Sequence, residues 1–223
     1  MRLIVFDCDG TLVDSQQTII TATEAALATH DFAPPPRRDI LYAVGLPLDT
    51  ALRRHAPQAT DDQIINMLDV YRETSQQLIQ QEDRGQVMFE GMREQIVQLG
   101  NLDDTLLGII TMKSKRGLNR VVDAYDIRSY FQVLKSADDG PGKPAPDLML
   151  DAMRETGASA AQTMMVGDTS FDIMMAKAAD TKAVGVGWGY QTVEELLDAG
   201  ADAIAETPEE LADLLAEFTP GDA

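Results

Sequence analysis

The sequence has little cysteine, histidine and positive charge, and each shortage excludes a class of protein. A single cysteine, Cys8, excludes an intramolecular disulfide. The chain has only two histidines, His30 and His55, so the usual zinc clusters of cysteine and histidine are excluded as well. The 18 basic and 37 acidic residues give a formal net charge of -19, which repels nucleic acid and anionic membrane surfaces. We therefore expect no nucleic-acid partner, no membrane partner and a reduced, cytoplasmic setting.

Long apolar runs are also missing. The apolar start at Leu3 ends at Asp7, which is too short for a signal peptide, and no later stretch approaches the roughly 18 continuous apolar residues of a membrane span. The 223 residues are 44% hydrophobic, which is enough for one large domain or two smaller ones with ordinary cores. The sequence does not distinguish a monomer from a dimer.

The most informative stretch is LIVFDCDGTL, residues 3–12. Its first four residues form an unbroken apolar run, which is typical of a strand buried on both sides in a parallel sheet. If strand geometry continues, Asp7 and Asp9 point the same way and Cys8 points the opposite way. Two such carboxylates repel each other unless a positive charge lies between them, and a divalent cation is the simplest candidate. By itself, D-x-D also fits an ordinary strand-to-turn junction.

Between residues 15 and 81 the sequence shows only helical patterns. Apolar spacing predicts a helix over residues 16–30 and a long helix that begins at the capping box of Thr60 and Gln63, with shorter pieces at 39–44 and 48–55. Because we expect no strand here, we interpret residues 15–85 as an inserted helical domain and residues 1–14 and 86–223 as the core domain. The chain should pass between them near residues 13–15 and 82–86, where Asp83, Arg84 and Gly85 form a polar linker. The alternative is that these helices cover the sheet as part of one domain.

Strands and helices alternate after residue 90, which is typical of a doubly wound parallel sheet. The predicted fold class is therefore α/β, a doubly wound, Rossmann-like core with an inserted helical domain. The expected strands are residues 106–110, 130–134, 163–166 and 183–186, and the expected helices are residues 92–99, 116–124, 147–156, 171–178 and a last helix after Thr207.

Three further polar residues follow predicted strands: Thr111, Lys143 and Asp168. Since the carboxyl ends of parallel strands meet at one edge of the sheet, we expect them near Asp7, with Asp172 in the first turn of the next helix. Taken singly, Thr111 could be a strand terminus, Lys143 a solvated lysine and Asp168 a helix cap. Together, carboxylates without histidine or cysteine form the hard oxygen set that Mg²⁺ prefers, and the lysine can balance their charge or hold a phosphate.

In chain order these residues resemble the motifs of the haloacid dehalogenase-like hydrolases, and the helical block resembles the small α-helical cap of the phosphoglycolate phosphatase-like branch. The resemblance implies that Asp7 is a nucleophile that forms an aspartyl-phosphate and that Asp9 acts as acid and then as base. It also implies that Mg²⁺ is held by Asp7, the backbone carbonyl of Asp9 and Asp168, with Asp172 supporting the metal shell, and that Thr111, Lys143 and Gly10 bind the phosphate. The motifs are Asp7-x-Asp9-Gly10-Thr11, Thr111, Lys143-Pro144-x-Pro146-Asp147 and Gly167-Asp168-Thr169-x-x-Asp172.

The resemblance implies a Mg²⁺-dependent phosphatase that acts on a small phosphorylated metabolite such as phosphoglycolate or a sugar phosphate. Asp9 favours phosphoryl transfer over carbon-halogen cleavage, because dehalogenases of the family lack an acid at this position. Met112 stands where the family commonly has asparagine, which weakens assignment to one substrate subgroup. The alternatives are a phosphomutase of the β-phosphoglucomutase type and a catalytically silent metabolite-binding protein.

Two other features have weaker functional interpretations. The stretch G-V-G-W-G at residues 185–189 is not a G-x-G-x-x-G fingerprint and follows a late strand, so we expect a loop beside the helical block rather than a dinucleotide site. Arg53, Arg54 and His55 could recognise a substrate carboxylate or a sugar, although a solvated helix face is the default interpretation.

Overall fold

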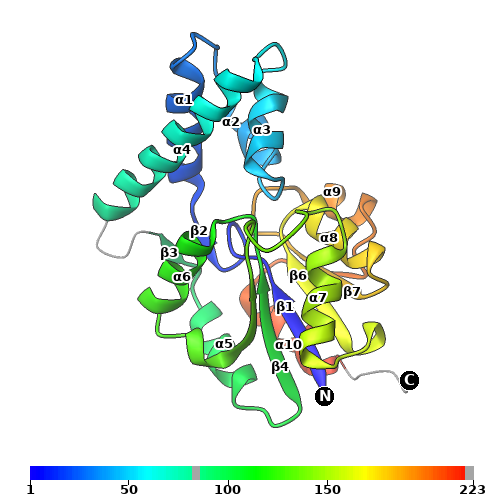
Figure 1. Cartoon of the computed structure of the whole chain (residues 1–223). Helices are drawn as coiled ribbons and strands as arrows, with labels where there is room; N and C mark the ends of the chain where they lie inside the picture. Colours follow the sequence, from blue (N-terminus) through cyan, green and yellow to red (C-terminus); the bar gives the residue numbers. More distant parts are fainter. Residues whose placement is uncertain (82–85, 219–223) are drawn as a thin grey trace.

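The computed structural model describes residues 1–81 and 86–218. Its centre is a six-stranded sheet in which all neighbouring strands are parallel (Figure 1). The order β5-β4-β1-β6-β7-β8 extends from β1 in both directions, so the predicted doubly wound fold is confirmed. The strands are β1 (Arg2–Phe6), β4 (Thr105–Ile110), β5 (Phe131–Lys135), β6 (Thr163–Gly167), β7 (Lys182–Val186) and β8 (Ala203–Ala205).

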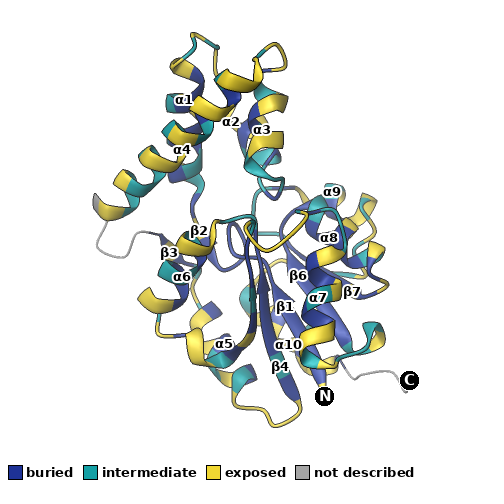
Figure 2. Cartoon of the chain, viewed as in Figure 1, coloured by how far each residue is buried: buried dark blue, intermediate teal, exposed yellow. Residues whose placement is uncertain are grey.

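Both faces of the sheet are covered, and Figure 2 shows its strands largely buried while the flanking helices expose their outer sides. Every residue of β1 is buried: Ile4 and Phe6 belong to the hydrophobic cluster on one face, Leu3 and Val5 to that on the other. Successive strand residues point to opposite faces, so only an unbroken apolar run suits this position. The first cluster includes α5 (Met92–Gly100), α6 (Lys115–Ala124) and α10 (Pro208–Glu217), and the second α7 (Asp147–Thr156), α8 (Ser170–Ala178) and α9 (Val193–Asp198).

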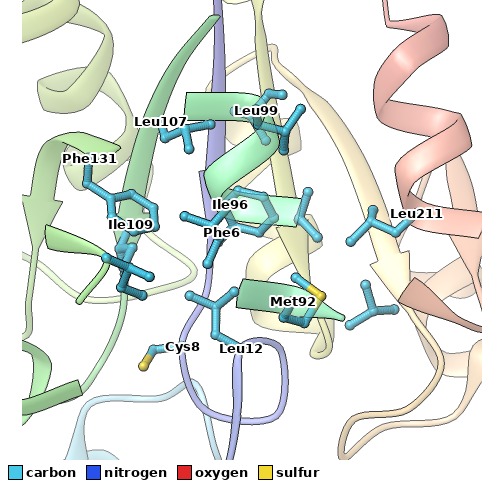
Figure 3. Packing of buried hydrophobic residues seen from close by; sticks show 14 of the residues in the cluster. Phe6, Cys8, Leu12, Met92, Ile96, Leu99, Leu107, Ile109, Phe131 and Leu211 are labelled. Atoms are coloured by element: carbon cyan, nitrogen blue, oxygen red, sulfur yellow. The ribbon is translucent and has the colours of Figure 1, made fainter. Parts of the chain in front are cut away.

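Cys8 lies in the first of these clusters, as the alternation along the strand predicts. Figure 3 shows its side chain near Leu12 and Ile109, and the residue is fully buried. Burial raises the pKa of the Cys8 thiol well above its usual range, so the thiol stays protonated and is a poor nucleophile. The cysteine between the two aspartates therefore contributes packing.

The sequence patterns miss two 3₁₀ helices, Arg128–Tyr130 and Ala160–Gln162, and three further short elements. The edge strand β8 has only three residues, which is too short for a clear period, and α9 is a six-residue helix capped by Thr192 and Glu195. The third element is the antiparallel pair of β2 (Val13–Asp14) and β3 (Val87–Met88), which no local pattern indicates because its strands are 73 residues apart. The other predicted strands and helices are present, with ends shifted by a few residues.

The first four helices form a block of their own at the carboxyl edge of the sheet (Figure 1). Three of them, at residues 16–28, 48–55 and 61–81, share a separate hydrophobic cluster that includes Leu27, Leu52, Ile64 and Met67. As predicted, residues 16–81 contain no strand. The helices are α1 (Gln16–Ala28), α2 (Arg37–Tyr42), α3 (Leu48–His55) and α4 (Asp61–Gln81).

The chain leaves the sheet for this block through β2 and returns through β3, so the two crossings lie side by side. The predicted linker at residues 82–86 lies outside the described residues except for Gln86. The division into domains at residues 15 and 85 stays a prediction. Among the described residues, no helix combines the length and the apolar content needed to cross a membrane.

Candidate active site

The structure brings the predicted polar residues together at the carboxyl ends of the central strands. Asp7 directly follows β1, and its N–H donates to the Val166 carbonyl at 2.9 Å. Thr111 directly follows β4, and Asp168 directly follows β6. Lys143 reaches the same place from the loop after β5, and its side chain is completely buried. Parallel strands end at one edge, so residues far apart in the sequence meet there.

Three carboxylates form the centre of this site. One oxygen from each of Asp7, Asp168 and Asp172 lies within 4.8 Å of the others, and all three residues are buried. Lys143 Nζ lies 2.6 Å from Asp7 Oδ1 and 2.5 Å from Asp172 Oδ1. The contact between Lys143 and Asp172 is an ion pair but not a hydrogen bond, and Asp172 Oδ1 has no hydrogen-bond partner. Lys143 thus pairs with two of the three carboxylates, and Asp168 has no ion pair among the described residues.

The pKa values show that this charge is under-compensated. Burial raises the pKa of Asp7 to about 7, with Asp172 and Asp9 adding to the rise, although Lys143 opposes it. Burial and the charges of Asp7 and Asp172 also raise the pKa of Asp168. Burial alone would lower the pKa of Lys143, but Asp172 and Asp7 outweigh it and hold the pKa above its usual value. The lysine therefore stays charged, and room remains for further positive charge.

The residues present fit a small, hard divalent cation. Three carboxylates form an all-oxygen set, they exceed the charge of Lys143, and Asp172 Oδ1 is a buried acceptor whose one polar contact is the ion pair with Lys143. Gly10 and Gly189 pack against Asp168 so closely that a Cβ atom at either position would collide with the aspartate side chain. Gly10 also has φ +82°, a conformation that favours glycine.

Hydrogen bonds fix the carboxylates in place. Thr11 Oγ1 donates to Asp168 Oδ1 at 2.9 Å, and the N–H of Tyr190 donates to Asp168 Oδ2 at 2.9 Å. Thr169 caps α8, and its N–H and hydroxyl donate to Asp172 Oδ2 at 3.1 and 2.7 Å. The sequence correctly places Asp172 in the first turn of a helix, where the helix dipole favours a carboxylate.

Asp9 has different neighbours from Asp7. Its Oδ1 lies 2.6 Å from Lys113 Nζ and also accepts from the Ser15 hydroxyl, whose oxygen lies 2.9 Å from the Tyr190 hydroxyl. Burial would lower the pKa of Lys113, but Asp9 outweighs it and raises the pKa. The side chain of Asp9 is not part of the carboxylate cluster, and a metal contact through its backbone carbonyl stays a prediction.

Sequence reasoning misses Ser15 and Tyr190 as site residues. Tyr190 comes from the glycine-rich loop after β7, and Trp188 of the same loop donates from Nε1 to the Thr11 carbonyl at 3.2 Å. The backbone N–H of Tyr190 donates to Asp168, and its hydroxyl contacts the Ser15 hydroxyl, which holds Asp9. Tyr190 therefore connects the surroundings of Asp168 and Asp9. Nothing in the local pattern of a glycine-rich loop distinguishes this role from a simple turn. The loop does lie beside the helical block, as predicted, since Gln191 just after it donates from Nε2 to the Tyr42 carbonyl of α2 at 3.4 Å.

The predicted phosphate ligands have mixed surroundings. Thr111 Oγ1 accepts from the Lys113 N–H at 3.2 Å and borders the open cavity beside Asp7. The N–H of Gly10 already donates to the Val13 carbonyl at 2.9 Å within the turn. Phosphate binding by Thr111, Lys143 and Gly10 stays a prediction.

A cavity of about 430 Å³ lies between this site and the helical block. Asp7, Asp9 and Thr111 border it on the sheet side, and residues of all four block helices border it on the other. Of the three basic residues considered in the block, only His55 borders it. Arg53 pairs with Asp61 at 2.8 Å, and Arg54 lies 5.0 Å from the Tyr42 ring centroid. Both arginines are exposed, so their default interpretation as solvated residues holds.

Fold and site together define a class of protein: a doubly wound α/β protein with a buried cluster of carboxylates and one lysine at its strand ends. The chain belongs to the haloacid dehalogenase-like hydrolases, because the family model described as "Haloacid dehalogenase-like hydrolase" matches residues 4–186. The predicted resemblance is confirmed. Our chain is a hydrolase of this family.

Individual proteins show the same similarity. A Dickeya dadantii protein named "Probable phosphatase IndB" is 34% identical over 92% of this chain and 89% of its own length. A phosphoglycolate phosphatase of Pseudomonas fluorescens is 28% identical over 99% of this chain and 79% of its own length. The crystal structure of a hydrolase from Pseudomonas syringae superposes with a TM-score of 0.86 at 25% identity, covering 97% of this chain and 99% of the other.

Proposed function

We propose that the protein is a Mg²⁺-dependent phosphatase that hydrolyses a small organic phosphomonoester through an aspartyl-phosphate. The observation that carries the proposal is the position of Asp7. Its carboxylate borders the cavity, ion-pairs with a buried lysine and lies within 4.8 Å of Asp168 and Asp172. A nucleophile in phosphoryl transfer needs such surroundings, because charge builds up on the phosphate oxygens.

In the proposed reaction, an Asp7 oxygen attacks phosphorus and the bond to the leaving alcohol breaks. Asp9, which also borders the cavity, gives the leaving oxygen a proton. Asp9 then takes a proton from water, and that water oxygen attacks phosphorus and releases Asp7 and inorganic phosphate. Lys113 and Ser15 hold the Asp9 side chain at the cavity edge before substrate binds.

A divalent cation, held by Asp7, Asp168 and the Asp9 carbonyl with Asp172 beside them, would neutralise phosphate charge and orient the ester. Lys143 keeps the Asp7 carboxylate in place, and Lys143 and Thr111 contribute positive charge and a hydroxyl for the phosphate oxygens. We propose that the helical block of residues 15–85 is a separate domain that covers the reacting groups and excludes water. The free, buried Cys8 supports a reducing, cytoplasmic setting.

Phosphate release tests this proposal. With Mg²⁺ and phenyl phosphate as substrate, Asp7→Asn should lower kcat by at least about 1000-fold while the protein stays folded by circular dichroism. The matched control is Asp62→Asn, an exposed aspartate in the first turn of α4, which should keep full activity. Turnover by Asp7→Asn at the wild-type rate would remove Asp7 as nucleophile. Phosphate transfer between sugar hydroxyls without phosphate release would instead favour a phosphomutase.

A further inference from the structure

The cavity has two chemically different parts beyond the carboxylates. Its wall on the helical block is mostly apolar, with polar residues such as Thr23 and Ser75 among them, and its margin along α4 and α6 carries arginines. The apolar residues of this wall come from α1 to α4 and the segments between them. They include Ile19, Ile40, Val44, Leu46, Leu52 and Ile79.

The arginines gather where α4 of the block meets α6 of the core. Arg116 and Arg120 are four residues apart on α6, so they lie on one face of this helix. Arg72 and Gln76 are related in the same way on α4. Gln76 contacts the Arg116 guanidinium, with the amide oxygen 2.9 Å from Nη1 in the orientation that lets it accept. This contact brings the two helices, and hence the arginines of both, to one side of the cavity.

Within the described residues, neither Arg116 nor Arg120 forms an ion pair with an acidic side chain. The acidic residue that borders the cavity near α6 is Asp138, and its carboxylate accepts from the Lys115 N–H at 2.8 Å. Unlike the exposed Arg53 and Arg54, both arginines border the cavity: Arg116 is exposed and Arg120 is half-buried, so their charges can act on an anion bound inside it. Arginine also suits carboxylate and phosphate groups geometrically.

We propose that the leaving alcohol of the substrate has an apolar body, which packs on the block wall, and a second anionic group, which pairs with Arg116 and Arg120. The inference rests on the proposed phosphatase function and narrows its substrate class. A two-carbon acid ester such as phosphoglycolate offers the anion but no apolar body, and a sugar phosphate offers a polar body. A cavity of about 430 Å³ instead has the size of sites that enclose drug-sized ligands.

Four phosphate esters separate the two recognition elements. Methyl phosphate has neither, 2-phosphoglycolate has only the anion, benzyl phosphate has only the apolar body and 4-carboxybenzyl phosphate has both. All four leaving groups are alkoxides, so differences in kcat/KM report recognition more than leaving-group reactivity. We expect kcat/KM to rise about tenfold from methyl to benzyl phosphate and about tenfold again on adding the carboxylate.

Matched variants assign each gain to its residues. Arg120→Gln should lower the ratio of kcat/KM between 4-carboxybenzyl and benzyl phosphate by about tenfold. The exposed Arg154→Gln on α7 should leave this ratio at its wild-type value. Ile79→Gln should lower the ratio between benzyl and methyl phosphate, whereas Ile65→Gln should not, because Ile65 is 58% exposed on the same helix and does not border the cavity.

A binding measurement separates this inference from the phosphatase proposal. Calorimetric titration of the Asp7→Asn variant with the same esters should give Kd values in the same order as kcat/KM. If phosphate is released from all four esters at equal kcat/KM and the Kd values are equal, the substrate class is wrong and the phosphatase function stands. If no ester is hydrolysed but the Kd order holds, the phosphatase function is wrong and the recognition site stands. Equal Kd values without turnover would overturn both.

Discussion

The strand-end site and the cavity wall are built on opposite principles. The site buries most of its charged groups: Lys143, Asp168 and Asp172 have almost no exposed surface. The wall consists mostly of half-buried and buried apolar side chains on a block with its own small core. Buried charges must be held at fixed distances by hydrogen bonds, whereas apolar contacts tolerate changes of shape. Chemistry therefore depends on the rigid sheet edge, and substrate choice can vary in the block without disturbing it.

Removing the buried lysine should break the site most severely. Lys143→Met leaves three buried carboxylates without their cation, and in metal-free protein this should lower the unfolding free energy by about 3–5 kcal/mol. The control Lys177→Met removes an exposed ion pair with Asp202 and should cost less than about 1 kcal/mol. Urea unfolding in EDTA measures both. Equal losses for the two lysines would contradict the view that the site is a buried charge cluster.

The raised pKa of Asp7 predicts how the site responds to pH. In metal-free protein, folded Asp7 keeps its proton up to about pH 7, while the unfolded chain loses it near 3.8. Between these values the folded state binds more protons, so the stability present below pH 3.8 is lost as the pH rises towards 7. Between pH 5 and 7.5, the unfolding free energy of the wild type should fall by about 2 kcal/mol more than that of Asp7→Asn.

Asp62→Asn is the control for this measurement and should follow the wild type at both pH values. Addition of Mg²⁺ should flatten the wild-type dependence, because a bound cation favours the ionised carboxylate. A wild type and an Asp7→Asn variant with the same pH dependence in EDTA would show that Asp7 titrates normally.

Tyr190 offers a smaller perturbation that touches the site only through another residue. Tyr190→Phe removes the hydroxyl 2.9 Å from Ser15 Oγ but keeps the backbone N–H on Asp168. Since Ser15 holds Asp9, we expect kcat to fall by about three- to tenfold and its pH profile to shift, with KM for methyl phosphate unchanged. A purely structural tyrosine would lower the melting temperature and leave the pH profile of kcat as it is.

The exposed arginines of the block should matter least. Arg53→Gln breaks only a surface ion pair with Asp61, so its cost in unfolding free energy should stay below about 0.5 kcal/mol. Its kcat/KM for 4-carboxybenzyl phosphate should remain within about twofold of the wild type, unlike that of Arg120→Gln. If Arg53→Gln lowered kcat/KM as much as Arg120→Gln, the anion site would have to be assigned to the outer face of α3 instead of α6.

Much of the site could be predicted because Asp7 and Asp168 each directly follow an apolar strand. Residues 3–6 and 163–166 are recognisable as buried strands from their apolar runs, and the carboxylates after them necessarily reach the same edge. Asp172 is recognisable from its place in the first turn of the helix that follows. Strand β8 and the β2–β3 pair could not be predicted, because two or three residues carry no period and pairing across 73 residues leaves no local trace.

The sequence alone determined the alternation of elements, the polarity of their ends and the charge balance, since all three are local properties of side chains. Only the tertiary structure decided that Tyr190 reaches Ser15, that Lys113 reaches Asp9 and that Arg116 and Arg120, rather than Arg53 and Arg54, border the cavity. Each of these contacts depends on the angle at which a helix or a loop lies against the sheet. Packing of the whole chain sets that angle, and no single segment encodes it.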